Sequence, residues 1–428
     1  MKRTVRQRYR VVPDKRQEQY FPALFGANRA VYNMFLWERE QLWAQKQEDP
    51  AAKIESMNTT ISRVTAFKNL PEDKEWLTKY PAWTVQKAAV QCRDSYLKWW
   101  DSLSGKSKAT HRKPRYKKRG RSKMSAQVEK PKTGFVVEKL NKNRSRIWCG
   151  KKIGWVKFKD SRTDLPVNAT GLTLVQEPSG KVYASFICEQ EIAEPKVTEN
   201  TDLKDLDVIS ADLGLVDLLV WVNTKGERGK IAAPRAYRKA EKQLKKAQRR
   251  YSRKQKSSNN QEKARQKLTL LHEKVRNTRQ DHQRKIASEL ASENQAVCLE
   301  SLNVAGMVKN RHLAKSVSDA ALGGLMEAVK NACEKRGTLL LQADRWAPTT
   351  KVCSQCGCDS ESKSLDVRVW RCLECDAVLD RDYNAAVNIM LAAGLADSLN
   401  ACGADARALA FVPEPDRVEA RNLLVPAA

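Results

Sequence analysis

Four cysteines in the last quarter of the chain constrain its fold most strongly. Cys353 and Cys356 form one CxxC pair, Cys372 and Cys375 form a second, and fifteen residues separate the two pairs. This spacing is typical of a zinc ribbon, in which four thiolates close a tetrahedral site with no open coordination position. We therefore predict one zinc ion with a structural role. Cys358 lies too close to Cys356 to belong to the same ligand set.

The net charge is the strongest signal in the composition. A formal charge of +29 results from 79 Lys and Arg against 50 Asp and Glu in 428 residues. Such a surplus repels itself unless a polyanion neutralises it, so nucleic acid is the expected partner. Apolar runs stay shorter than the roughly 20 residues of a membrane span, which argues against a membrane partner. The cysteines outside the CxxC pairs are scattered, which favours a reducing, cytoplasmic compartment.

Three acidic residues adjoin apolar segments in the C-terminal half. Asp212 follows the strand-like run VISA, Glu300 follows AVCL, and Asp382 opens a helix-like segment. A carboxylate in such a place loses hydration, and a divalent cation would offset that cost. Two Mg²⁺ ions about 4 Å apart could clamp the attacking water and the leaving oxygen of a phosphodiester. Spacing alone equally allows acids that cap helices or form salt bridges.

Hydrophobic periodicity divides the chain into three regions. It predicts a short basic strand at the N-terminus, a helix from about residue 23 to 47, and a second helix that Thr84 caps. Residues 133–191 consist of short β-rich runs with a hairpin turn at 178–180, which predicts a small antiparallel barrel or sandwich. Strands and helices alternate after residue 206 and predict an α/β core with a mixed sheet. Two basic helices within 235–293 should hinge near Ser258, and a later helix should stop at Gly337.

Several motifs occur in a fixed order along the chain. They are ADLGL at 211–215, LESLNVAGM at 299–307, DRWAPTTKVCSQCG at 344–357 and RVWRCLECDAVLDRDYNAAVNIM at 368–390. Together they resemble the TnpB family of insertion-sequence proteins and, more distantly, the miniature type V CRISPR nucleases. The N-terminal run ANRAVYNMFLWER resembles the first helix of that family's recognition lobe. Asp376 stands where the family usually has Gly after the last cysteine, and Leu379 where His is common.

The resemblance implies a multidomain α/β plus β fold. Its parts would be an RNase H-like (RuvC) nuclease core with a zinc-ribbon insertion, an N-terminal wedge β-barrel and a helical recognition lobe. The expected boundaries in chain order are wedge 1–22, recognition lobe and basic linker 23–125, wedge 126–205, RuvC core 206–346 with a basic helical hairpin at 235–293, target-nucleic-acid-binding ribbon 347–377, RuvC C-terminal helix 378–396 and a disordered tail 397–428.

The resemblance also implies an activity and a set of partners. The chain would be an RNA-guided, metal-dependent DNA endonuclease of a transposable element that cuts target DNA beside a short adjacent motif. Asp212, Glu300 and Asp382 match the catalytic acids that would hold two Mg²⁺ ions, and Asp382 is preferred to Asp380 because it directly precedes the xNAA motif. Cys353, Cys356, Cys372 and Cys375 match the zinc ligands. Guide RNA and double-stranded DNA would be the partners of a monomeric ribonucleoprotein, in the cytoplasm of a prokaryote and at its nucleoid.

Other functions remain open at this point. The chain could be a nuclease-inactive RNA-guided regulator, a compact type V CRISPR effector, or a RuvC-like enzyme that resolves DNA junctions without RNA. A DDE-type transposase fits poorly, because a zinc ribbon lies between the second and third acids.

Candidate nucleic-acid contacts lie in several segments. Because base pairing with the guide would read the target sequence, the protein needs mainly contacts to the nucleic-acid backbone. The candidates are Tyr32, Asn33, Gln86 and Lys87 for the adjacent motif, Arg112, Lys113, Arg115 and Lys117 on the basic loop, Arg249 and Arg250 on the hairpin, and Arg371 on the ribbon.

Overall fold

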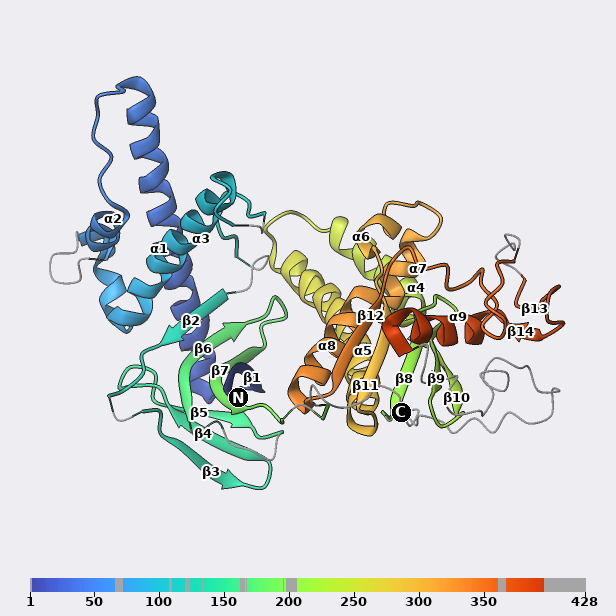
Figure 1. Cartoon of the computed structure of the whole chain (residues 1–428). Coiled ribbons are helices and arrows are strands. Elements are labelled where there is room, and N and C mark those ends of the chain that lie inside the picture. Colours follow the sequence, from blue (N-terminus) through green and yellow to red (C-terminus); the bar gives the residue numbers. More distant parts are fainter. Residues whose placement is uncertain are drawn as a thin grey trace. The chain divides into compact units, whose positions relative to one another are not determined.

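The chain divides into two compact units, Lys2–Glu191 and a C-terminal unit from Ile192 onward (Figure 1). The computed structural model describes residues 2–65, 72–107, 110–119, 124–132, 134–161, 166, 168–194, 196–197, 206–360 and 367–395. The tail expected at 397–428 lies outside the described residues. No described helix is both long and apolar enough to cross a membrane.

The strands of the N-terminal unit form two antiparallel sheets around one core. In sheet order they are β1 (Lys2–Arg10), β7 (Val182–Glu191), β6 (Ala169–Gln176) and β2 (Met124–Val128), and then β3 (Val137–Asn141), β4 (Arg144–Trp148) and β5 (Trp155–Lys159). The rings of Tyr9, Phe158 and Phe186 join the sheets at centroid distances of 5.1 to 5.6 Å. The predicted hairpin turn is confirmed, since Gly180 has φ +84° and its N–H donates to the Glu177 carbonyl. The described strands form two sheets, and an isolated antiparallel bridge between Val11 and Phe158 joins the segment after β1 to β5.

Helices make up the rest of the N-terminal unit. They are α1 (Lys15–Glu48), α2 (Met57–Val64), the 3₁₀ helix η1 (Glu72–Lys79) and α3 (Ala82–Leu103). The predicted start near residue 23 is wrong, because a capping box of Asp14 and Gln17 starts α1 at Lys15 and Pro22 lies inside the helix. The predicted cap at Thr84 is also wrong: α3 follows Pro81, and Thr84 is buried without capping the helix.

A mixed five-stranded sheet forms the centre of the C-terminal unit, as predicted. Its order is β10 (Arg228–Ala232), β9 (Asp217–Asn223), β8 (Val208–Asp212), β11 (Ala296–Glu300) and β12 (Leu339–Ala343). The last three strands run parallel, and β9 and β10 are antiparallel to their neighbours. The first four residues of β8 and of β11 are buried, which explains why all of them except Ser210 are apolar.

Helices cover both faces of this sheet (Figure 1). α5 and α8 pack on one face, where Leu290 and Leu325 share a core with Val297, and α9 packs on the other with Ile389. The predicted hinge and stop are confirmed, because Ser258 caps α5 and Gly337 ends α8 with φ +69°. The elements outside the central sheet are α4 (Ala236–Ser252), α5 (Asn259–Glu293), α6 (Val304–Met307), α7 (Ala314–Ala320), α8 (Leu322–Arg336), the ribbon strands β13 (Val369–Arg371) and β14 (Val378–Asp380), α9 (Arg381–Met390) and the turn η3 (Leu391–Leu395).

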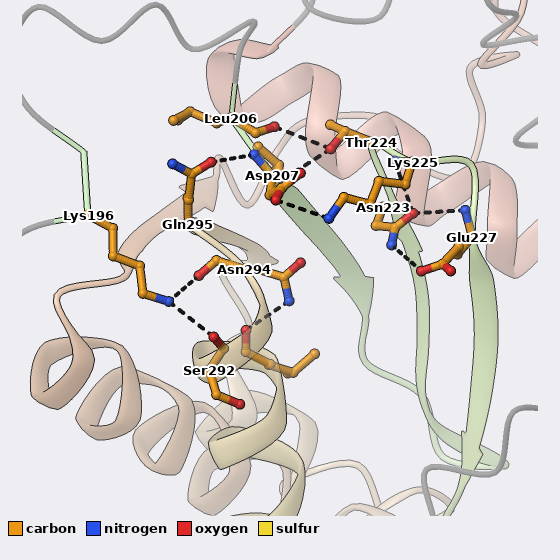
Figure 2. A network of polar contacts seen from close by, with 12 residues as sticks. Lys196, Leu206, Asp207, Asn223, Thr224, Lys225, Glu227, Ser292, Asn294 and Gln295 are labelled. Carbon is orange, nitrogen blue, oxygen red and sulfur yellow. Dashed lines mark hydrogen bonds and ion pairs between the residues drawn. The ribbon is translucent and has the colours of Figure 1, made fainter.

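A polar network fixes the register of the sheet at one edge (Figure 2). The Gln295 side chain accepts a hydrogen bond from the Asp207 N–H at 2.8 Å, which ties the starts of β11 and β8 together. The Thr224 hydroxyl joins the Val208 N–H to the end of β9 at 3.2 Å. With the strand starts fixed, the carboxyl ends of β8 and β11 are level at the opposite edge.

Candidate active site and metal centre

Two of the predicted acids lie side by side at the carboxyl edge of the parallel strands. Asp212 is the last residue of β8 and Glu300 the last of β11, and the preceding residues Ala211 and Leu299 are register partners. Each carboxyl group acts on the pKa of the other. Ligands of open α/β sheets bind outside the carboxyl ends of the strands, so this edge is the expected place for a site.

The electrostatics of the pair disfavour two full negative charges. Burial raises the pKa of Asp212 to about 6, and the charge of Asp382 contributes to the increase. Burial and the adjacent Asp212 raise the pKa of Glu300 to about 7. A carboxyl pair in this state holds a proton that a cation could replace.

Asp382 and Asp380 have different roles at the start of α9. Asp380 caps the helix, because its Oδ1 accepts from the N–H groups of Asp382 and Tyr383 at 2.9 and 3.1 Å, while its Oδ2 pairs with Lys230 at 2.9 Å. Asp382 lies near enough to raise the pKa of Asp212. Its two oxygens accept from Nη1 of Arg368, each at 3.0 Å. The structure thus engages Asp380 in capping α9 and in pairing with Lys230, and brings the charge of Asp382 within range of Asp212.

The three carboxylates suit Mg²⁺ chemically, since they supply oxygen donors whose charge burial disfavours. Their oxygen atoms are not all as close together as the ligand atoms of a metal site. In the described part of the chain, only the four cysteines place three or more candidate ligand atoms all within 4.8 Å of one another. Arg368 forms an ion pair with Asp382, so a cation that binds Asp382 would have to displace the guanidinium or share the carboxylate with it.

Buried asparagines fix α9 and were missed by the sequence analysis. Asn384 accepts from the Ser354 N–H at 2.9 Å and donates to the Val352 carbonyl at 2.9 Å. Asn388 donates to the carbonyls of Thr349 and Val352 at 2.8 and 2.7 Å. Two asparagines one helical turn apart behind DRDY were the available signal. They connect the helix of Asp382 directly to the first CxxC segment.

The four cysteines meet as the spacing predicted. The sulfurs of Cys353 and Cys375 are 3.7 Å apart, and those of Cys356 and Cys372 are 3.6 Å apart. A tetrahedral zinc site with Zn–S bonds of about 2.3 Å requires sulfurs roughly 3.8 Å apart. Burial opposes the charge of Cys372, but backbone N–H groups and the Cys356 sulfur lower its pKa to about 7. The geometry and this thiolate character fit a closed metal site.

The residue after each CxxC pair adopts a left-handed conformation. Gly357 has φ +75° after the first pair, and Asp376 has φ +61° after the second. The departure from Gly noted in the sequence therefore falls on a position where a side chain is strained. Asp376 compensates with a contact, since both its oxygens accept from Arg371 at 3.1 Å.

The candidate nucleic-acid contacts in the helical region fall into two groups. Tyr32 is buried beneath the Lys117 amine, which lies 3.9 Å from its ring centroid, and Asn33 exchanges two hydrogen bonds with the Lys117 backbone. In the structure both residues thus hold the basic loop. Gln86 is exposed, and Lys87 lies 5.1 Å from the Trp83 ring centroid.

The other candidates are at the surface. Arg112, Lys113 and Arg115 line a groove of about 510 Å³ with Glu40 and Tyr116. Arg249 and Arg250 are exposed near the end of α4, and Arg371 is exposed on β13.

Three family models match parts of the chain. They are a "Probable transposase" family (OrfB_IS605) at 187–311, the Cas12f1-like TNB domain at 323–389, and the helix-turn-helix domain of the OrfB_IS605 group at 1–48. In this structure residues 2–48 form one strand and one continuous helix, not a helix-turn-helix.

Relatives and solved structures match nearly the whole chain. A Streptomyces pristinaespiralis protein named "Putative RNA-guided DNA endonuclease" is 32% identical over 398 residues, which cover 92% of this chain and 90% of the relative. The "Putative RNA-guided DNA endonuclease InsQ" of Escherichia coli K12 is 27% identical and covers 94% and 95%. The Cas12f1–sgRNA–target DNA complex matches with a TM-score of 0.53 and 16% identity, over 88% of this chain and 83% of that chain. This likeness shows the multidomain α/β fold, and identity of 32% along nine-tenths of both sequences shows that the chain belongs to the TnpB family.

Proposed function

We propose that the chain is an RNA-guided DNA endonuclease that hydrolyses phosphodiester bonds at Asp212, Glu300 and Asp382. One observation carries the proposal: two adjacent parallel strands end in partly buried carboxyl groups with raised pKa values, and the charge of a third acid, Asp382 on α9, acts on Asp212. The names of the two relatives support the guided reaction. The carboxyl pair supports the hydrolytic chemistry.

The three carboxylates would hold Mg²⁺ through oxygen atoms. When bound, Mg²⁺ activates a water molecule and neutralises the charge that develops on the phosphate. A bound cation would offset the cost of burying negative charge. Asp212 and Glu300 would therefore give up the proton that the pair holds when Mg²⁺ binds. Asp380 is paired with Lys230, so Asp382 is the acid at the start of α9 that would serve as a metal ligand. Two ions per site and the in-line geometry belong to this proposal.

The zinc ribbon would act as a support for the site. One structural zinc at the four cysteines would make the first CxxC segment rigid, and Asn384 and Asn388 would transmit that rigidity to α9. Loss of zinc should therefore impair cleavage although no cysteine touches the substrate.

Guide RNA and double-stranded DNA are the proposed partners of a monomeric ribonucleoprotein at the nucleoid. The two sheets of the N-terminal unit are proposed to form the wedge barrel, and helices α1 to α3 the recognition lobe, with the boundaries given above. Gln86 and Lys87 would contact the motif beside the target. Exposed basic residues would contact the nucleic-acid backbone; they are Arg112, Lys113, Arg115, Arg249, Arg250 and Arg371, with Lys117 anchoring its loop.

The test begins with RNA that co-purifies with the full chain. Its sequence identifies the guide, and a plasmid carrying the matching target is then incubated with the complex and Mg²⁺. Cleavage should be absent in EDTA and in Asp212→Asn, and retained in Asp207→Asn, which removes a half-exposed carboxylate from the start of the same strand. Target binding without cleavage by the wild type would favour the regulator. Equal activity of RNA-free protein on branched DNA would favour a junction resolvase.

A further inference from the structure

One tryptophan has no structural explanation for its position. Trp346 is 84% exposed, whereas the next most exposed tryptophan, Trp37, is 53% exposed. A tryptophan side chain carries a large apolar area that proteins normally bury or use in an interface. Leaving it in water adds nothing to stability, whereas tryptophan side chains are enriched where proteins bind their partners.

Trp346 lies close to the carboxyl edge of the sheet where the acids meet. β12 ends at Ala343, which is the register partner of Glu300. Trp346 follows three residues later, so its Cα is at most about 10 Å from that of Ala343. The intervening turn is held, because Oδ1 of Asp344 accepts from the Trp346 N–H at 2.7 Å and its carbonyl accepts from Ala347 at 3.1 Å. The indole is therefore mounted on an ordered turn beside the candidate active site.

The segments around this edge carry positive charge at the surface. Arg345 and Lys351 flank Trp346 in sequence, and Lys309 and Arg311 lie on the segment that follows β11; all four are exposed. Aromatic side chains among exposed cations are the usual platform for single-stranded nucleic acid, because bases stack on the ring while phosphates meet the charges. A duplex keeps its bases stacked internally, so the fitting ligand is an unpaired strand.

We propose that Trp346 stacks on a base of the DNA strand being cut and so positions its phosphodiester at Asp212, Glu300 and Asp382. This inference rests on the proposed nuclease function and names the strand contact of the same site. Trp346 is a positioning residue, because it holds the substrate without taking part in proton or metal chemistry. Every base has a face to stack, so the contact is tolerant of sequence.

Photocrosslinking tests the contact without requiring cleavage. The full chain bearing Asp212→Asn, with its co-purified RNA, is bound to target DNA that carries 5-bromodeoxyuridine in place of thymidine, and is then irradiated. Trypsin cuts after Arg345 and Lys351, so the crosslink should appear by mass spectrometry on the six-residue peptide 346–351. DNA crosslinks confined to other peptides would overturn the proposal, as would a crosslink of this peptide to the guide RNA alone.

Cleavage kinetics supply the second readout. Trp346→Ala should lower kcat/KM by about 10- to 100-fold, and Trp346→Phe should recover most of it, because a smaller ring still stacks. Leu140→Ala is the control, since Leu140 is 42% exposed on β3 and is given no role in binding or cleavage, and should cleave like the wild type. Melting temperatures should be unchanged in all three variants. Wild-type rates in Trp346→Ala would refute the inference, and if the wild type fails to cut at all, the proposed function fails while the crosslink still decides the DNA contact.

Discussion

Replacing Asp212 with Asn is expected to stabilise the metal-free protein at pH 8. The carboxyl is partly buried at the end of β8, and its pKa of about 6 compares with an ordinary value of 3.8. Because a factor of ten in proton affinity corresponds to about 1.4 kcal/mol, the difference amounts to about 3 kcal/mol. Asn has nearly the same shape and carries no charge.

The sign of the effect depends on pH. A carboxyl whose pKa is raised in the folded state contributes stability that is complete below about pH 4 and is lost as the pH rises through about 6. The wild type therefore loses stability over this interval, and Asp212→Asn does not. The two proteins should unfold alike near pH 4, and the variant should be more stable by up to about 3 kcal/mol at pH 8.

Thermal melting in EDTA measures this difference. For a unit the size of the C-terminal one, about 3 kcal/mol corresponds to a rise of roughly 6 to 12 °C in its melting temperature. Adding Mg²⁺ should raise the melting temperature of the wild type and leave that of Asp212→Asn unchanged. Asp207→Asn, which breaks a half-exposed pair with Lys225, should change little in either condition. An Asp212→Asn protein that melts at or below the wild-type temperature at pH 8 would refute the desolvation argument.

Three further predictions concern other parts of the C-terminal unit. Cys372→Ser should release zinc, as measured with a colorimetric chelator, and lower the melting temperature of this unit; full zinc retention would contradict the four-thiolate site. Arg368→Gln should tighten Mn²⁺ binding, followed by electron paramagnetic resonance, by up to about five-fold, since the cation no longer competes with an ion pair worth about 1 kcal/mol; weaker binding would show that Arg368 helps to build the site. Gly337→Ala should destabilise by more than about 1 kcal/mol in a melting experiment, because φ is +69° and the new methyl group would collide with the Glu194 carbonyl, whereas Gly26→Ala, which has open space around it, should have no such effect.

The sheet of the C-terminal unit was the most predictable part of the fold. An apolar run that ends in an acid, as at Asp212 and Glu300, indicates a strand buried on both faces with a polar carboxyl end. The stop at Gly337 and the cap at Ser258 are local signals, and local signals need no knowledge of the rest of the chain. The positions of Asp212 and Glu300 at the ends of their strands could therefore be predicted from the sequence.

Features that depend on distant contacts were not predictable. Hydrophobic periodicity placed the start of α1 near residue 23, yet Phe21 and Phe25 are buried in the core of the two sheets, and this burial supports the early helical turns. Tyr32 looked like a surface contact because its partner Lys117 lies 85 residues away. Arg368 meets Asp382 because β13 pairs with β14, which leads directly into α9. Such pairs join residues that are distant in the sequence, so they become visible only in the tertiary structure.

The attachment of α9 to the centre of the sheet has a consequence for the order of synthesis. The Ser210 hydroxyl donates to the Ala386 carbonyl at 2.7 Å, so the last helix closes onto one of the first strands of its unit. Asp382 leaves the ribosome 170 residues after Asp212 (382 − 212), an interval of about 10 to 30 s at bacterial rates of elongation. An incomplete chain therefore lacks the third acid and its supporting ribbon throughout this time. Under the proposed function, a nascent or truncated product that lacks Asp382 would be inert toward DNA, and cutting would begin only with chains translated beyond that residue.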